Sequence, residues 1–209
     1  LRNPELLKAV QKYLNQLGVT VYENSEVASL SEDSTGNVTG VKTKQGKTFE
    51  SDAVLLAAGS WSHELAEQSG FELPVRPVKG QIILLKTKPG TLKHIVKHDD
   101  AYFVPRQDGR VLVGASMENV GFEAGNTVSI MHGLLTATLK LVPGLKDAEI
   151  EQQWMGFRPG SPDGLPFLGP VTSKPGLWAA TGHYRNGVAL APITAELRAN
   201  WMLGTKPSL

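Results

Sequence analysis

The sequence predicts an α/β fold (α+β in the broader sense) in which a second, mainly β domain is inserted into the first. An unbroken apolar run over residues 52–59 ends in small residues and is typical of a strand buried on both faces of a parallel or mixed sheet. From residue 74 the chain changes to short β segments, and from residue 177 a strand followed by a long helix restores the first pattern. The order α/β, mostly β, then α/β again indicates the insertion.

The first 72 residues begin with a predicted amphipathic helix. Its apolar residues recur at helical spacing on one face: Leu6, Leu7, Val10, Leu14 and Leu17. We expect Asn3 to cap this helix, Pro4 to fit its first turn and Gly18 to end it. The strands expected next are at 19–21, 38–41, 48–49 and 52–59, followed by a short helix over 62–68.

Residues 73–155 form the predicted inserted domain. Its expected strands are 78–87, 95–97, 102–105, 111–115 and 150–157. An amphipathic helix is expected to stop at Pro143-Gly144, with four residues on its inward face: Val128, Met131, Leu135 and Thr138. Asp108-Gly109 is a strong hairpin signal between two of these strands. Residues 156–209 are expected to return to the first domain. They comprise the end of a Gly/Pro-rich loop over 154–170, a strand at 177–181 and a last helix over 188–203.

The composition excludes several function classes. In 209 residues, 21 Lys and Arg face 20 Asp and Glu, so a net charge of +1 gives no electrostatic reason to bind nucleic acid or an anionic membrane. The absence of Cys removes disulfides, thiolate metal sites and a cysteine-linked flavin. Five His residues without metal-ligand spacing predict no metal site. No apolar stretch reaches the length of a membrane-spanning helix, and no Gly-x-Ser-x-Gly motif indicates a hydrolase. We expect a cytoplasmic protein, and a homo-oligomer is possible.

Arg158 is chemically conspicuous in the Gly/Pro-rich loop. Between Trp154 and Pro170 the only other charged residue is Asp163. A guanidinium among Gly, Pro and aromatic residues is costly to desolvate unless an anion meets it. One interpretation is an internal ion pair with Asp163. The other is a planar fork that receives a substrate carboxylate through two hydrogen bonds.

A second candidate site is the Gly182–Gly187 segment, GHYRNG, which joins a predicted strand to a predicted helix. Unpaired N–H groups and a partial positive charge gather at such a turn and suit an anionic ligand group. The alternative is an ordinary βα turn whose glycines adopt positive φ. Taken alone, Tyr102 and Met117 are interpreted as core residues, since aromatic and Met side chains on strands more often pack in a core than line a pocket.

Five stretches together resemble the D-amino acid oxidase superfamily, and within it the glycine oxidases of thiamine biosynthesis. They are DAVLLAAGSWSHEL (52–65), VRPVKGQIILL (75–85), AYFVPRQDGRVLVGASM (101–117), WMGFRPGSPDGLPFLGP (154–170) and AATGHYRNGVALAP (179–192). The resemblance implies a Rossmann-type FAD-binding domain, present here in part, with an inserted antiparallel-sheet substrate domain. The Gly-x-Gly-x-x-Gly fingerprint that binds the flavin pyrophosphate is absent. We therefore expect this chain to be the C-terminal part of a longer protein.

The resemblance also implies roles for particular residues. Arg158 of GFRPG corresponds to the carboxylate-binding arginine, and Tyr102 and Met117 correspond to pocket-lining residues. Arg185 corresponds to a cation near flavin and substrate, and Asp100 to a polar pocket position. The expected contacts to non-covalent FAD are Val27, Ala58, Gly59, Trp61, Gly182, His183, Tyr184, Arg185, Asn186, Gly187 and Val188.

The implied reaction is FAD-dependent oxidative deamination of glycine, sarcosine or small D-amino acids. The amino acid, water and molecular oxygen would give a 2-oxo acid, ammonia and hydrogen peroxide. A sarcosine oxidase or D-amino acid dehydrogenase of the same superfamily is the first alternative. The second alternative is a binding or structural domain that is catalytically inactive by itself.

Overall fold

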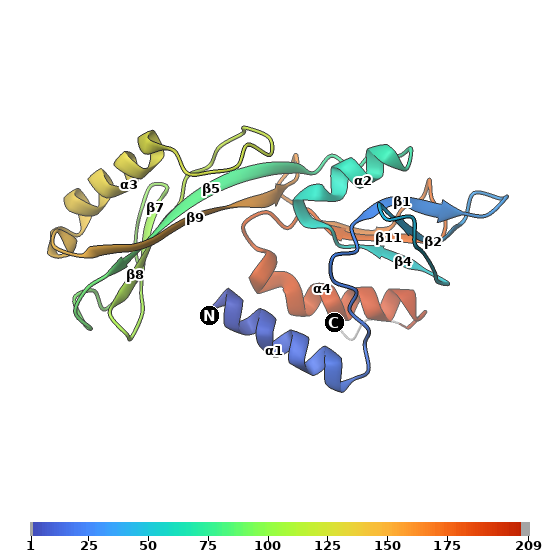
Figure 1. Ribbon diagram of the computed structural model, residues 1–209, viewed down its shortest axis with the longest axis horizontal. Helices are drawn as coiled ribbons and strands as arrows, with labels where there is room; N and C mark the ends of the chain where they lie inside the picture. The colour runs from blue at the N-terminus through green and yellow to red at the C-terminus, as the bar shows by residue number, and fades with distance from the viewer. Residues whose placement is uncertain (1, 206–209) are drawn as a thin grey trace. The chain divides into compact units, whose positions relative to one another are not determined.

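A computed structural model describes residues 2–205, and the chain separates into two compact units. Unit 1 comprises the residues up to Pro74 together with those from Ser161 onward, and unit 2 is Val75–Gly160. Figure 1 shows their elements in the order of the chain. The unit 2 limits differ from the predicted 73–155, chiefly because its last strand continues to Gly160.

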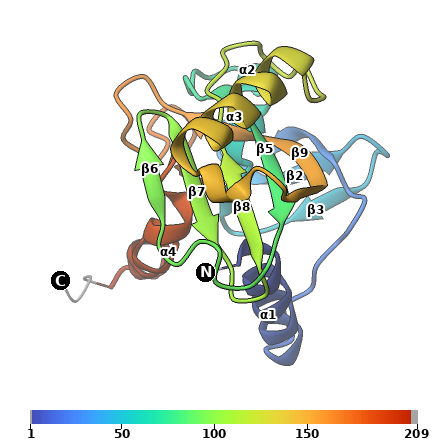
Figure 2. The same ribbon diagram turned by 90° about the vertical axis from the view of Figure 1, so that its left-hand side faces the viewer.

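Unit 2 is a five-stranded antiparallel sheet with the order β6-β7-β8-β5-β9. The strands are β5 (Arg76–Lys86), β6 (Val96–His98), β7 (Ala101–Pro105), β8 (Arg110–Gly114) and β9 (Glu149–Gly160). Helix α3 (Val128–Leu141) lies across one face of this sheet (Figure 2). Ile83, Phe103, Val113 and Leu134 meet there in a buried core, and the 3-10 helix η2 (Pro143–Leu145) adds Leu145.

Strand β9 confirms the strand predicted over 150–157 and corrects the overlapping prediction of a loop from Trp154. Residues 154–160 pair with β5 without interruption, from Trp154 opposite Ile82 to Gly160 opposite Arg76. Because β9 is at the edge of the sheet, a proline such as Pro159 is tolerated there. The Gly and Pro content therefore concealed the end of this strand, and Arg158 lies on that part of it.

Unit 1 contains two three-stranded sheets. The first has the order β1-β2-β3, with β1 (Val27–Glu32), β2 (Val38–Thr43) and β3 (Thr48–Glu50). The second has the order β10-β11-β4, with β4 (Val54–Leu56), β10 (Phe167–Pro170) and β11 (Leu177–Thr181). The helical elements are α1 (Asn3–Gln16), η1 (Gly59–Trp61), α2 (Ser62–Gln68) and α4 (Gly187–Met202).

Strand β4 pairs with β11 in parallel, which confirms the predicted parallel or mixed sheet. The prediction that this strand is buried on both faces was wrong. Residues 54–56 form an edge strand within the residues described, and the Leu55 side chain is 41% exposed whereas Leu56 is buried. The fold class itself, helices and a mixed sheet with an antiparallel β unit between them, is confirmed.

Helix α1 forms as predicted, but its N-cap residue and its lack of buried residues did not follow from its apolar pattern. Asn3 is its first helical residue and Arg2 occupies the N-cap position, so the expected cap was wrong. No α1 residue is buried, and Leu7 is 68% exposed. The expected strand at 19–21 does not form, since the segment before Val27 has no strand partner among the described residues.

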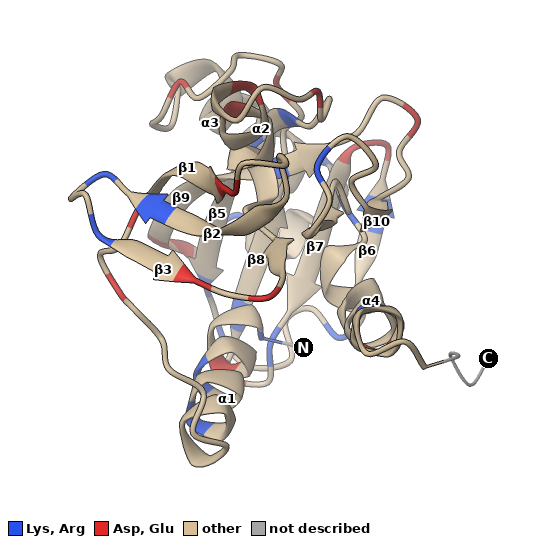
Figure 3. Ribbon diagram, turned by 90° about the vertical axis from the view of Figure 1, so that its right-hand side faces the viewer, with Lys and Arg blue, Asp and Glu red and all other residues tan. Residues whose placement is uncertain are grey.

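Basic and acidic side chains are interspersed along the ribbon (Figure 3), in agreement with the nearly balanced charge of the chain. Within residues 2–205, none of the helices combines the length and apolar character needed to cross a bilayer.

Candidate active site

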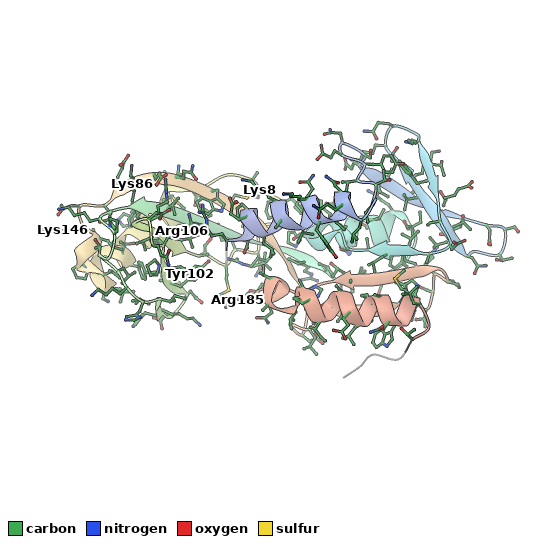
Figure 4. The ribbon with its side chains drawn as sticks, turned by 90° about the horizontal axis from the view of Figure 1, so that it is seen from below. Lys8, Lys86, Tyr102, Arg106, Lys146 and Arg185 are labelled. Atoms are coloured by element: carbon green, nitrogen blue, oxygen red, sulfur yellow. The ribbon has the colours of Figure 1, made fainter. Side chains whose placement is uncertain are left out.

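The sheet of unit 2 has a core face and an opposite face, and side chains alternate between them. Ile83, Phe103 and Val113 lie side by side in the β5–β8–β7 register and all belong to the core. Tyr102 pairs with Gly114, one position away from that core pair, so both lie on the opposite face. Figure 4 labels Tyr102 on this sheet.

Arg158 lies on the same face as Tyr102. It pairs with Val78, which is five positions from Ile83 along the uninterrupted β5–β9 ladder, and an odd separation reverses the face. Gly80 is two positions from Val78 and so lies on the Arg158 face as well. The structure thus brings the predicted carboxylate-binding arginine and the predicted pocket tyrosine to one side of one sheet.

Two buried glycines allow these side chains to approach the sheet closely. A Cβ built on Gly80 would stand 2.6 Å from Cζ of Arg158 and closer still to both Nη atoms. A Cβ built on Gly114 would stand 2.7 Å from Cζ and Oη of Tyr102. Sequence reasoning missed both glycines, although a glycine inside a strand pattern is itself a signal of close approach.

Arg158 and Asp163 form hydrogen bonds with different partners. Nη1 of Arg158 donates to the backbone carbonyl of Ser116 at 3.1 Å. Oδ1 of Asp163 accepts the N–H of Leu165 at 3.0 Å, an Asx-type contact that shapes its own turn. Four of the five guanidinium N–H groups of Arg158 have no protein acceptor among residues 2–205.

The other two predicted substrate-site residues are more exposed. Met117 follows Ser116 directly and its side chain is 43% exposed. Asp100 lies in the exposed turn between β6 and β7, two residues before Tyr102. Both belong to unit 2, as do Tyr102 and Arg158.

Unit 1 contains a cavity of about 480 Å³ beside the end of β4. Three of the predicted cofactor contacts line it, namely Val27, Ala58 and Trp61. The remaining lining residues are Glu26, Leu30, Val41, Lys44, Val54, Leu55, Leu56, Ala57, Glu64, Leu65 and Gln68. Its apolar walls and the positive φ of the neighbouring Gly59 suit a flat, partly apolar ligand that approaches backbone closely.

Two hydrogen-bonded hydroxyl groups, called the hydroxyl relay below, stabilise the segment beside this cavity. The Ser62 and Thr181 hydroxyls are 2.8 Å apart, and Oγ1 of Thr181 donates to the Gly59 carbonyl at 3.1 Å. Ser62 and Thr181 are both buried. The relay therefore links the 57–59 segment to the end of β11, where the GHYRNG turn begins.

The GHYRNG turn connects β11 to α4 in unit 1. Gly182 has a φ of +79°, and a Cβ there would lie 3.1 Å from the Phe167 ring, so the turn requires glycine. Tyr184 also has positive φ, at 50°. Nε2 of His183 lies 3.0 Å from Oγ1 of Thr194 on α4, and burial lowers the pKa of the His183 imidazole. This contact fixes the turn to the helix that follows it.

The rest of the turn faces outward. Arg185 and Asn186 are exposed, and Figure 4 shows Arg185 just before α4. Asn186 precedes the helix without a side-chain cap, and Val188 in the first turn is 43% exposed. The N–H groups of that first turn therefore remain available to an acceptor, as the sequence predicted for an anionic ligand group.

The family-level comparison decides the broad identity. Residues 1–201 match the family model described as FAD dependent oxidoreductase. The chain belongs to this family. Its predicted kinship with the D-amino acid oxidase superfamily is thereby confirmed, and FAD is the cofactor of the family.

Individual relatives point the same way. A glycine oxidase of Pseudomonas aeruginosa is 42% identical over 99% of this chain and 57% of its own length. A bifunctional protein ThiO/ThiG of Synechocystis is 42% identical over 99% of this chain and 31% of its own length. The crystal structure of a glycine oxidase from Bacillus cereus superposes with a TM-score of 0.88 at 32% identity, covering 99% of this chain and 57% of that one. The chain thus spans little more than half the length of these glycine oxidases.

The residues present fit FAD at two places in unit 1. The cavity at Val27, Ala58 and Trp61 offers apolar walls for an aromatic ring system, and the GHYRNG turn offers backbone N–H donors. Gly182 and Gly59 supply the backbone conformations that close approach requires.

Proposed function

We propose that this chain is the substrate-binding and part of the flavin-binding portion of an FAD-dependent oxidase that deaminates glycine and other small amines. Sarcosine and small D-amino acids are the further substrates in this proposal. With one water consumed, the products are a 2-oxo acid, ammonia (methylamine from sarcosine) and, with oxygen as oxidant, hydrogen peroxide. The similarity to glycine oxidases and to a ThiO/ThiG protein supports a place in thiamine biosynthesis as part of the same proposal.

One observation carries the substrate assignment, the presentation of Arg158. Its guanidinium lies close against Gly80, uses one N–H for the Ser116 carbonyl, and shares a sheet face with Tyr102. Because the remaining donors form a planar fork, they match a carboxylate in bidentate geometry. An amino acid held there by its carboxylate would have its amine and Cα placed by the same contact.

The other unit 2 residues would limit the size of the substrate or add a polar group to its pocket. Tyr102 and Met117 would limit the room beside the bound carboxylate by contact, and Asp100 would contribute a polar group at the pocket entrance. Steric discrimination of this kind is modest, about 1–3 kcal/mol for a methylene-sized difference. Glycine and sarcosine should therefore be good substrates, D-alanine weaker and D-phenylalanine poor.

In unit 1, we propose that Val27, Ala58, Gly59 and Trp61 hold the adenosine side of FAD and that Gly182–Val188 follows the ring system. Bound FAD would supply the two-electron oxidation of the amine carbon–nitrogen bond. The first turn of α4 would stabilise negative charge with its N–H groups, and Arg185 would add a cation. Since orientation and charge placement are the protein's contribution, no side-chain base is required.

The experiment that tests the proposal is Arg158→Ala in the flavin-loaded protein. Loss of a charge-assisted contact worth about 1.5–3 kcal/mol should lower kcat/KM for glycine roughly 10- to 100-fold. Flavin absorbance should stay near that of the parent protein. Unchanged glycine turnover together with a weakened fold would instead support the structural role of Arg158.

A substrate panel scored by peroxide and ammonia release separates the proposal from its alternatives. Preference for D-phenylalanine, or clear turnover of an L-amino acid, would contradict the pocket assignment. Amine oxidation without peroxide would indicate a dehydrogenase of the same superfamily.

A further inference from the structure

A buried polar network lies on the core face of β5, directly behind Gly80. The Gln81 side chain is fully buried, and its Nε2 donates to both carboxylate oxygens of Glu118 at 3.0 Å. Its Oε1 accepts the backbone N–H of Thr127 at 2.8 Å. A polar side chain in the middle of an apolar strand is thus fully satisfied, which is the condition for keeping it there.

The same network fixes the segment that carries the Arg158 acceptor. The Ser116 hydroxyl accepts the backbone N–H of Gln81 at 2.9 Å and donates to Glu118. The backbones of Lys79 and Glu118 exchange two hydrogen bonds of 3.0 Å, and the buried Lys79 ammonium lies 3.8 Å from the Glu118 carboxylate. Residues 116–118 are therefore anchored to β5 by both backbone and side chains.

These contacts give Arg158 two supports. Gly80 leaves the space that the guanidinium occupies, and the Ser116 carbonyl accepts one of its N–H groups at 3.1 Å. A long flexible side chain would otherwise lose considerable rotamer freedom on binding a ligand. Holding the fork in place beforehand removes part of that cost.

We infer that Gly80 and Ser116 are positioning residues for Arg158, with Gln81 and Glu118 holding Ser116 in place from the opposite face of the sheet. The inference rests on the proposed function, in which Arg158 binds the substrate carboxylate. Gly80 acts by lacking a side chain, because any Cβ there lifts the guanidinium off the sheet. Ser116 acts through its carbonyl, whose position depends on its own hydroxyl contacts.

The test uses acetate as a carboxylate ligand and the flavin-loaded protein, with affinity measured by isothermal titration calorimetry. Gly80→Ala should weaken acetate binding about 10-fold, the loss expected when one charge-assisted hydrogen bond is misaligned. The strand should persist, since the added methyl meets only the end of a flexible side chain. Flavin absorbance and melting temperature check this.

Gly156→Ala is the matched control. Gly156 pairs with Gly80 across the β5–β9 ladder, and a Cβ there meets nothing within 4 Å. This variant adds the same methyl to the same face and should keep acetate affinity within about twofold of the parent, the range of a neutral surface change. Equal losses in both variants would overturn the inference.

A double-mutant cycle separates positioning from general structural damage. In an Arg158→Ala background, Gly80→Ala should have no further effect on acetate affinity, because its effect acts through the guanidinium. A loss of the same size in both backgrounds would overturn the inference. If Arg158→Ala alone leaves acetate affinity unchanged, the proposed function fails instead, and the two failures are thereby distinguished.

Ser116→Ala tests the second support without touching the carbonyl. Removing the hydroxyl frees the Gln81 N–H and the Glu118 carboxylate from Ser116, so the carbonyl loses its anchor. Acetate affinity should fall by about threefold, less than for Gly80→Ala, since the acceptor is loosened and not removed. Unaltered affinity in a folded protein would remove Ser116 and its partners from the positioning role.

Discussion

Unit 2 encloses the apolar side chains between its sheet and α3, although Val128 at the start of that helix is 87% exposed, whereas unit 1 leaves more of its large apolar side chains in solvent. Ile83, Phe103 and Val113 are at most 1% exposed beneath α3. In unit 1, Leu7 on α1 is 68% exposed and Leu203 after α4 is 77% exposed. The difference teaches that apolar periodicity predicts where an element forms but not whether another element covers it.

The same contrast applies to polar groups. In unit 2 the buried Gln81 and Lys79 have partners of suitable chemistry. In unit 1 the buried Arg198 has none for Nε, Nη1 or Nη2 among the described residues, and lies instead against the Trp201 ring, with Cζ 4.1 Å from its centroid. Among the described residues, the buried side-chain atoms without a hydrogen-bond partner are the three Arg198 nitrogens and Oγ of Ser161 in unit 1, and Oδ1 of Asn126 in unit 2.

The largest expected effect comes from truncating the unit 2 core. Phe103→Ala should destabilise unit 2 by about 3–5 kcal/mol, through lost burial and the cavity left behind. The matched truncation Leu7→Ala on the exposed side of α1 should change stability by less than about 0.5 kcal/mol. Amide hydrogen exchange of β7 and α1 under mild denaturant measures each unit separately. Comparable losses in the two variants would remove the contrast between the units.

A smaller and opposite effect is expected at Arg198. Leaving buried charged donors unpaired costs about 1–3 kcal/mol, while the contact with Trp201 returns about 0.5–2 kcal/mol. Burial also lowers the pKa of this guanidinium. Arg198→Met should therefore stabilise the chain by about 1 kcal/mol in urea unfolding, whereas the exposed Lys12→Met should not. Destabilisation by Arg198→Met would show that the guanidinium has a favourable partner.

Much of the fold was predictable from local patterns. The helices α1 and α3 follow from apolar spacing, and the Asp108-Gly109 hairpin follows from turn chemistry. The last residues of β9, 158–160, were missed because Gly and Pro outweighed the pairing with β5, a long-range contact that composition does not report. Burial of β4 on both faces was wrong for a related reason, since coverage depends on neighbours distant in sequence.

The cations of the candidate site could be predicted from the sequence, whereas the residues that hold Arg158 in place could not. Arg158 was conspicuous because it is a lone charge among Gly, Pro and aromatic residues. Gly80, Gln81 and Ser116 lie in stretches that resemble the family, but their contacts to Arg158 and its support arise only when β5, β9 and the 116–118 segment come together. The assignments of Arg158, Tyr102, Met117, Arg185 and Asp100 to substrate or flavin stay predictions.

The smallest expected effect is a pH dependence that arises in unit 1 at His183. Burial lowers the pKa of this imidazole below its ordinary 6.5, so the folded chain takes up the proton less readily than the unfolded chain. Above pH 6.5 both states are neutral at this position and stability is unaffected by it. As the pH falls from 6.5 toward the folded pKa, the unfolded state gains the proton first and stability declines, by at most about 1.4 kcal/mol per pH unit for one proton. The melting temperature between pH 5 and 8 measures this, and His183→Gln should flatten the curve near pH 6 while the exposed His94→Gln should leave it unchanged. A melting temperature that rises as the pH falls from 6.5 would mean that the protonated imidazole is favoured in the folded chain, and that the contact with Thr194 is not made by a neutral ring.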